Sequence, residues 1–468
     1  MKRVVVLVVG VIWLGLGGQP LLFSQAVAGS SNEAAPIAYA FVNGRWFDGR
    51  GFQRATWYAV EGRFTQRPPV GVVETVDLAG AFIVPPFGEA HNHNVEGEWD
   101  LDSVAARYLR DGIFYVKIPN NVRDFALRSR GRLNRPSTID VAFAHAGITG
   151  IGGHPIGLYE DILRVSRYEP EVGPLERGWF QNRAYVQVET PQEADEKWPI
   201  VLSGEPEFIK AYLAHAEAVV TGGLRATKEE RRGLNPDLLP VIVGKAHASG
   251  KRVTVHVETA NDFRLAVQAE ADEIAHLPGW IVGNAEDVAL ARLTEDDARS
   301  AARRGVTVVT TTVAAEGMPV TAMPHQHGHT AHPNRSGPVE ERAGGDRTLH
   351  AEARKVQREN LHLLHRHGVR LVIGSDHADT SLAEINHLRS FGLFDNLTLL
   401  KMWCEATPAA IFPDRKIGRF EEGYEASLLA LADDPLDDFE AVQGIRLRVK
   451  QGHLLQDSSW TKPDERKR

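Results

Sequence analysis

The sequence predicts an α/β protein in which a (β/α)8 TIM-like barrel is combined with a small β-sandwich domain built from both termini. Eight short apolar runs recur between residues 81 and 375, and helical patterns lie between most of them. Alternation of this kind is typical of a parallel sheet, and eight units favour a barrel. Strand-like segments rich in aromatic and β-branched residues precede and follow this middle region. The chain has 468 residues, 43% of them hydrophobic, which is enough for one large barrel with an appendage.

Residues 1–28 are expected to be a signal peptide. A basic start at residues 2–3 is followed by an apolar run at 4–16, and Ala-Val-Ala at 26–28 fits the usual cleavage pattern. The apolar run is too short for a comfortable membrane span, although an uncleaved anchor is the alternative interpretation. We therefore expect an exported protein, periplasmic or extracellular, with no membrane contact beyond export.

Residues 36–84 and 414–456 are expected to form one composite β-sandwich domain. The first segment contains several strand-like stretches and the dipeptide Asn43-Gly44, which is a strong hairpin turn signal. The second segment repeats this composition, with apolar runs between residues 426 and 455. Two strand-rich ends around one long middle region predict a β domain to which both termini contribute.

Residues 85–413 are expected to form the barrel. The predicted helices between its strands carry capping signals. In one of them Thr294 precedes three acidic residues, and Gly305 follows the last helical residue. Two long connections, 149–206 and 314–349, break the regular pattern, and connections of that length are usually functional or mobile. The eight predicted strands are 81–85, 112–118, 139–144, 207–213, 252–258, 273–276, 305–313 and 370–375.

The composition excludes several classes of protein. Fifty-three Lys and Arg against 61 Asp and Glu give a net charge of −8, so the chain lacks the basic balance of a nucleic-acid binder. One cysteine, Cys404, excludes an internal disulfide framework and a Cys-rich zinc module, and it is expected to be a buried helical thiol without chemistry. The 19 histidines are more informative.

Polar side chains recur late in the predicted strands or directly after them. Positions i and i+2 of a strand share a face, so His91 and His93 can direct two imidazoles to one point. Barrel enzymes place their catalytic groups at the C-terminal strand ends. The candidate site residues are, in strand order, His91 and His93, Lys210, His256, His276 and Asp376.

Four histidines, one lysine and one aspartate supply nitrogen and oxygen donors, which suit Zn²⁺ and also Mn²⁺, Fe²⁺ or Co²⁺. A bound divalent ion lowers the pKa of its water from about 15.7 to about 7 and so supplies hydroxide at neutral pH. An ammonium group has no lone pair for a metal, but Lys210 carbamylated by CO2 could bridge two ions about 3.5–4 Å apart. Asp376 could bind one ion and also accept the proton of the attacking water.

These motifs resemble those of the amidohydrolase superfamily, and within it the imidazolonepropionase-like and prolidase-like branch. Residues 85–93 are similar to the family's P-G-hydrophobic-x-D-x-H-x-H entry, with Glu89 in the usual Asp position. Residues 207–210, Glu-Phe-Ile-Lys, are similar to the D-F-I-K strand that carries the carbamylated lysine. The other similar segments, in matching order, are 255–256, 274–276, 374–376 and the returning strand 418–429.

The resemblance implies an enzyme that hydrolyses a C–N bond of a small-molecule amide, cyclic amide or dipeptide by metal-activated hydroxide. It implies two divalent metal ions, with Zn²⁺ the first expectation. His91, His93 and Asp376 would hold one ion, His256 and His276 the other, and carbamylated Lys210 would bridge them. Asp376 would take the water's proton and pass it to the leaving nitrogen.

Several alternatives stay open from the sequence. Lys117, at the end of another predicted strand, could take the place of Lys210. The enzyme could also be a mononuclear deaminase-like hydrolase, which needs no metal-binding lysine, or the chain could be a non-catalytic exported metal-binding protein on the same fold. His154 of the Gly-Gly-His segment and Tyr212 are candidate substrate-binding residues. The alternative for His154 is an exposed position in a Gly-rich turn, and the alternative for Tyr212 is packing in the core. The four histidines between residues 325 and 332 could be a second metal site or a solvated lid. A homo-oligomer is compatible with the sequence.

Overall fold

The computed structural model describes residues 38–71, 73–217, 232–279, 285–315 and 339–455. The expected signal peptide and the histidine-rich stretch 325–332 lie outside these residues. In the part of the chain that is described, no helix is long and apolar enough to cross a membrane.

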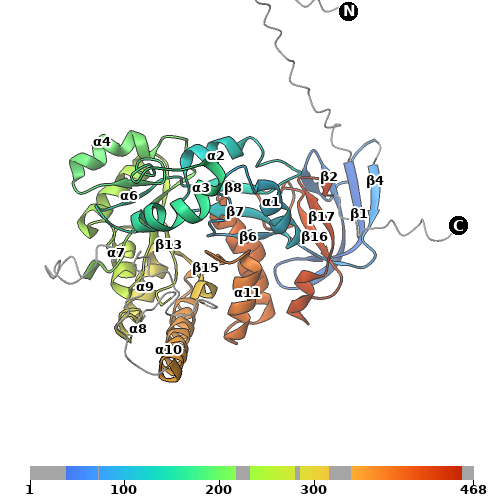
Figure 1. The fold of residues 1–468 in the computed structure, drawn as a ribbon. Coiled ribbons are helices and arrows are strands. Elements are labelled where there is room, and N and C mark those ends of the chain that lie inside the picture. The colour runs from blue at the N-terminus through green and yellow to red at the C-terminus, as the bar shows by residue number, and fades with distance from the viewer. Residues whose placement is uncertain (1–37, 72, 218–231, 280–284, 316–338, 456–468) are drawn as a thin grey trace, which may run out of the picture. The chain divides into compact units, whose positions relative to one another are not determined.

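Both ends of the chain contribute strands to one sheet, as the blue and red strands of Figure 1 show. The strand order is β18-β17-β16-β5-β1-β2-β3, and β4 lies beside β1. Trp46, Trp57 and Phe64 pack together in an apolar cluster that belongs to this sheet. The strands form one hydrogen-bonded sheet to which both termini contribute. They are β1 (Ala38–Phe47), β2 (Phe52–Val60), β3 (Arg63–Thr65), β4 (Val73–Asp77), β5 (Phe82–Val84), β16 (Leu428–Leu431), β17 (Ile445–Lys450) and β18 (His453–Leu455).

Two expectations about this region are wrong. Asn43-Gly44 forms no hairpin turn, because β1 continues through it with a register shift against β2 and with Asn43 at a φ of 59°. The first predicted barrel strand, 81–85, belongs to the terminal sheet, where β5 pairs with β1 and β16. Pro85 and Pro86 have no backbone N–H and end that ladder, so the chain enters the next sheet as β6, Phe87–Glu89.

The middle of the chain forms two parallel sheets, with the orders β6-β7-β8 and β10-β9-β11-β12-β13-β14-β15. Nearly all residues of these strands are buried, as expected for parallel sheets that helices cover. The strands are β7 (Ile113–Ile118), β8 (Asp140–Phe143), β9 (Gly147–Thr149), β10 (Tyr185–Gln187), β11 (Phe208–Tyr212), β12 (Arg252–His256), β13 (Glu273–Ala275), β14 (Thr307–Val309) and β15 (Arg370–Val372).

The expected closed barrel is seen only as a barrel-like arrangement of these two sheets. The two sheets are linked by isolated backbone hydrogen bonds, from Ala90 N to Ile373 O at 2.8 Å and from Glu207 N to Phe143 O at 2.9 Å. The first bond brings the end of β6 next to the end of β15. The C-terminal ends of strands from both sheets therefore meet at one place.

The helices follow the strands as the alternating pattern predicts. Helix α9 (Glu295–Arg304) begins at Thr294, which forms a capping box with Asp297, and ends at Gly305 with a φ of 67°. The other helices are α1 (Leu101–Arg110), α2 (Arg123–Arg130), the π-helix η1 (Leu158–Tyr168), α3 (Glu169–Val172), α4 (Pro191–Val201), η3 (Pro236–Leu238), α6 (Leu239–Ala248), α7 (Ala260–Gln268), α8 (Ala285–Leu290), η4 (Thr312–Ala315), α10 (Val339–Arg366), α11 (Ser381–Ser390), α12 (Asn396–Lys401), η5 (Met402–Ala406), α13 (Thr407–Ile411) and η6 (Phe439–Gln443).

Candidate active site

The segments that follow β6 and β15 are joined backbone to backbone and bring three of the predicted residues together. Asp376 N donates to His91 O at 2.7 Å, and His93 N donates to Asp376 O at 3.3 Å. The Asp376 Oδ1 atom then lies 3.5 Å from His91 Nε2 and 3.3 Å from His93 Nε2. These three side chains can place one donor atom each within 4.8 Å of one another, so they could hold a divalent cation.

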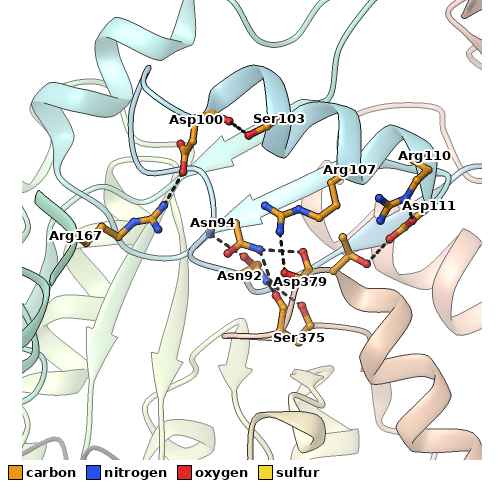
Figure 2. Close-up of polar contacts among 12 residues, drawn as sticks. Asn92, Asn94, Asp100, Ser103, Arg107, Arg110, Asp111, Arg167, Ser375 and Asp379 are labelled. Carbon is orange, nitrogen blue, oxygen red and sulfur yellow. Dashed lines mark hydrogen bonds and ion pairs between the residues drawn. The ribbon is translucent and has the colours of Figure 1, made fainter. Parts of the chain in front are cut away.

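Glu89 holds the backbone of this pair of segments in place. Its Oε1 accepts hydrogen bonds from Ser375 N at 2.9 Å and from His91 N at 3.2 Å, and its Oε2 accepts one from Ser375 Oγ at 2.5 Å. Burial raises the pKa of the Glu89 carboxyl to about 8. On the other side Asn92 Nδ2 donates to Ser375 Oγ at 2.9 Å (Figure 2). Glu89 and Asn92 are therefore supports that fix the two segments.

The remaining predicted donors line the same buried cavity as this trio. The rings of His91 and His276 have centroids 4.4 Å apart, and those of His276 and His256 are 4.7 Å apart. Lys210, on β11, is also in the cavity wall. The structure thus brings all six predicted residues to one cavity.

The protonation of the cavity favours metal binding. Burial lowers the pKa of the His91 and His276 imidazoles well below the ordinary value, so both rings are neutral and keep a free lone pair. Burial alone would raise the pKa of the Asp376 carboxyl, but His377, His91 and His93 lower it well below its usual range. Neutral imidazoles around a carboxylate are the donor set that Zn²⁺ and similar ions prefer.

Lys210 is a buried amine with an unsatisfied nitrogen. Its Nζ has no hydrogen-bond partner among the described residues and lies 5.2 Å from the centre of the Tyr212 ring. Burial lowers its pKa to about 7, although Asp376 acts in the opposite direction. A neutral amine is the form that reacts with CO2, so this side chain fits a bridging carbamate.

The rival lysine, Lys117, has a different position. Its Nζ donates to Glu273 Oε1 at 2.5 Å and to Thr254 Oγ1 at 2.9 Å, and it is not among the residues that line the cavity. Lys117 is therefore engaged in a buried ion pair, and Lys210 is the lysine that faces the candidate metal ligands.

Both candidate substrate-binding residues lie in the cavity wall. The His154 ring is 4.7 Å from the His256 ring and 5.1 Å from the Tyr212 ring, and all three side chains are buried. The long connection that begins near residue 149 thus places His154 over the ends of β11 and β12.

Sequence reasoning missed a group that supports His256. Glu258 Oε1 lies 3.4 Å from His256 Nε2, and Glu258 Oε2 lies 3.0 Å from His215 Nε2. Burial opposes ionisation of Glu258, yet His215 and His256 lower its pKa well below the ordinary value. The period of two along a strand could have indicated Glu258, because it follows His256 by two positions.

Two of the candidate donors have strained backbones. His276 and Asp376 have φ angles of 76° and 54°, in the left-handed region that side-chain-bearing residues rarely adopt. Such strain persists only where the surrounding structure enforces it, and it clusters at active sites. Both residues follow the end of a parallel strand, which is where the cavity opens.

Histidine and aspartate donors gathered at the strand ends of a parallel α/β fold make this cavity a candidate metal site. Residues 200–454, more than half of the chain, match the sequence model of the Amidohydrolase family. The chain therefore belongs to the amidohydrolase family, which are hydrolases that act on carbon–nitrogen bonds. No curated protein sequence matches it.

Several solved structures have the same fold at low sequence identity. A prolidase complexed with N-methylphosphonate-L-proline has a TM-score of 0.65 and 17% identity, over 90% of this chain and 100% of that one. A structure described as an amidohydrolase has a TM-score of 0.64 and 18% identity, over 90% and 99%. The A. niger ochratoxinase has a TM-score of 0.61 and 16% identity, over 90% and 96%.

Proposed function

We propose that this protein is an exported, metal-dependent amidohydrolase that cleaves a C–N bond of a small amide, cyclic amide or dipeptide. The observation that carries the proposal is the convergence of His91, His93, Lys210, His256, His276 and Asp376 on one buried cavity. Export rests on the signal-peptide pattern of residues 1–28 alone. The prolidase and the Xaa-Pro dipeptidase among the structural neighbours support a prolidase-like branch and dipeptides as substrates.

In this proposal His91, His93 and Asp376 would hold one divalent ion, and His256 and His276 would hold the other. Carbamylated Lys210 would supply a ligand that the two ions share. When bound, such ions acidify water and polarise a carbonyl oxygen. Asp376, whose carboxyl stays ionised, accepts the proton of the attacking water and delivers it to the leaving nitrogen.

The cavity suits a small substrate. Its volume is about 190 Å³, which is below the range of about 300–1,000 Å³ that is typical for drug-sized ligands. His154 and Tyr212 line it beside His256 and are proposed to contact the substrate.

One observation favours a mononuclear enzyme as the second candidate. Among the described residues, His91, His93 and Asp376 are the one group of three or more His, Cys, Asp or Glu residues whose donor atoms all lie within 4.8 Å of one another. A deaminase-like hydrolase with one ion would need no more than this trio, and Lys210 would then remain an unmodified amine.

The proposal is tested by metal analysis combined with a hydrolysis screen of cyclic amides, N-acyl amino acids and Xaa-Pro dipeptides. Removing metal with a chelator should abolish activity, and adding back Zn²⁺, Mn²⁺, Fe²⁺ or Co²⁺ should restore it. Asp376→Asn should lower kcat by about 10²- to 10⁴-fold, because it removes the proton acceptor.

Asp379→Asn is the matched control. Asp379 is 84% exposed, pairs with Arg107 and does not line the cavity, so this change should leave kcat unaltered. If metal-loaded protein hydrolyses no compound of the screen, the non-catalytic metal-binding alternative replaces the proposal.

A further inference from the structure

The π-helix η1 presents one face to the candidate active site. Four of its residues line the cavity together with the metal-ligand candidates: Leu158, Tyr159, Leu163 and Arg167. Positions 159, 163 and 167 are four apart, and 158 and 163 are five apart. Such spacings return to the same face of a π-helix, whose hydrogen bonds join residues five apart. This face therefore combines an apolar wall with one guanidinium group.

The Arg167 guanidinium has N–H donors beyond the one that pairs with Asp100. Its Nη2 lies 3.1 Å from Asp100 Oδ2, and Figure 2 shows the two side chains facing each other. Its Nε is buried and has no hydrogen-bond partner among the described residues, while the side chain as a whole is 33% exposed. Arginine carries five N–H donors, so the pair with Asp100 orients the guanidinium group and leaves other N–H donors for a ligand.

Besides Asp100, a second acidic group near this face is already engaged. Glu96 also lines the cavity, but its Oε2 accepts a hydrogen bond from Tyr168 Oη at 2.5 Å. Arg167 is the only arginine among the described residues that line the cavity. A planar guanidinium pairs with a carboxylate through two parallel hydrogen bonds, which makes arginine the preferred partner of that group.

We propose that Arg167 binds a free carboxylate of the substrate, so that the preferred substrates are N-acyl amino acids or dipeptides with an uncapped C-terminus. An apolar substrate side chain packs against Leu158, Tyr159 and Leu163. This inference rests on the proposed amidohydrolase function and narrows its substrate class. Neutral cyclic amides, which lack a carboxylate, are then poor substrates.

The test compares the free acid with its C-terminal carboxamide for an N-acetyl amino acid and for an Xaa-Pro dipeptide. Release of the product of the same internal C–N bond is measured in all four compounds. Wild-type enzyme should show a kcat/KM about 10- to 100-fold higher for the acids, which is the range expected for a charge-assisted hydrogen bond. Equal rates for acid and carboxamide in the wild type would overturn the inference while leaving the proposed function intact.

Arg167→Met should reduce the acid-to-carboxamide preference to about 1, by lowering kcat/KM for the acids alone. Arg167→Lys, which keeps the charge but loses the planar pair, should retain part of the preference. A preference unchanged in both variants overturns the inference. If wild-type enzyme with metal cleaves none of the four compounds and nothing in the wider screen, the proposed function fails and the inference fails with it.

Arg164→Met is the matched control on the same helix. Arg164 pairs with Glu169 at 2.6 Å and does not line the cavity, so its removal should leave the acid-to-carboxamide preference as in the wild type. Thermal unfolding of all three variants separates loss of the fold from loss of recognition. A loss of preference in Arg164→Met equal to that in Arg167→Met would assign Arg167 a merely structural role.

Discussion

Lys210 and Lys117 are both buried lysines on parallel strands, and their surroundings give them different chemistry. Lys117 has a carboxylate and a hydroxyl within hydrogen-bond distance, whereas Lys210 Nζ has no hydrogen-bond partner among the described residues. An unpartnered buried amine is costly unless it binds or reacts with something. Carbamylation would convert the Lys210 amine into a ligand at a point where two groups of candidate metal donors meet.

Lys210→Met is expected to lower the bound metal from about two ions per chain to about one, and to reduce kcat strongly. The physical reason is that the bridging oxygen atoms are lost while His91, His93 and Asp376 remain. Metal content by mass spectrometry and steady-state kinetics on the same preparation provide the measurement. Lys245→Met, at a lysine that pairs with Asp195 on the surface, is the control.

A result of one ion per chain in both wild type and Lys210→Met, with activity retained, would contradict the binuclear site. The mononuclear alternative would then stand.

At the scale of elements, one ion pair joins the two parallel sheets. Lys117 is on β7 of the three-stranded sheet, Glu273 is on β13 of the seven-stranded sheet, and their side chains meet at 2.5 Å. Lys117 also lies over the Phe208 ring, 4.1 Å from its centre. Backbone contacts between the sheets are isolated, so this buried pair adds a side-chain link across the interior.

Lys117→Met is expected to lower the free energy of unfolding by about 3–5 kcal/mol, because it leaves the Glu273 carboxylate buried without its cation. The double variant Lys117→Met/Glu273→Leu should recover most of that loss, since no charge then remains in the interior. Equilibrium urea unfolding of the two single variants and the double variant gives the coupling energy. Additive losses in the double variant would mean that the pair does not couple the sheets.

The elements that sequence patterns predicted best are those with strong local signals. The ends of α9 follow from Thr294 and Gly305, because side-chain capping and a left-handed glycine are decided within a few residues. Asn43-Gly44 carries an equally local turn signal, but the pairing of β1 with β2, β4 and β5 overrides it. Tertiary context decides strands more than helices, which is why residues 81–85 join the terminal sheet although the sequence pattern predicts a barrel strand.

Most of the candidate site was predictable and its surroundings were not. Five of the six donors lie at or beyond a strand end, and Lys210 lies within β11. Strands of parallel sheets deliver such residues to one edge, so their convergence follows from the order of the strands. Arg167 lies on a π-helix within a long connection, and no periodicity signals that kind of helix. Its orientation depends on Asp100, which is distant in sequence.

For the whole molecule, buried neutral histidines oppose stability in acid. His145 is buried, its Nε2 lies 3.1 Å from Gly204 O, and burial followed by the charge of Arg130 lowers its pKa to about 4. In the unfolded chain this imidazole titrates near 6.5. The unfolded state therefore binds a proton that the folded state rejects as the pH falls from about 6.5 to about 4, and stability decreases over that window.

His145→Gln is expected to flatten the pH dependence of the unfolding free energy between pH 6.5 and 4, by up to about 3 kcal/mol. The unfolding free energy at several pH values, measured by urea titration, provides the comparison with wild type. His247→Gln is the control, because His247 is 42% exposed and pairs with Asp272 at the surface. Parallel pH curves for wild type and His145→Gln would contradict the assignment.

The backbone hydrogen bonds between the segments that follow β6 and β15 have a consequence for biogenesis. His91 and His93 come from the start of the parallel-strand region and Asp376 from its end, and backbone bonds between the two segments hold them together. A nascent chain on the ribosome has no such trio until residue 376 has been synthesised. Whatever cation the trio would take, its uptake requires a chain that has been synthesised at least through Asp376 and has brought the two segments together.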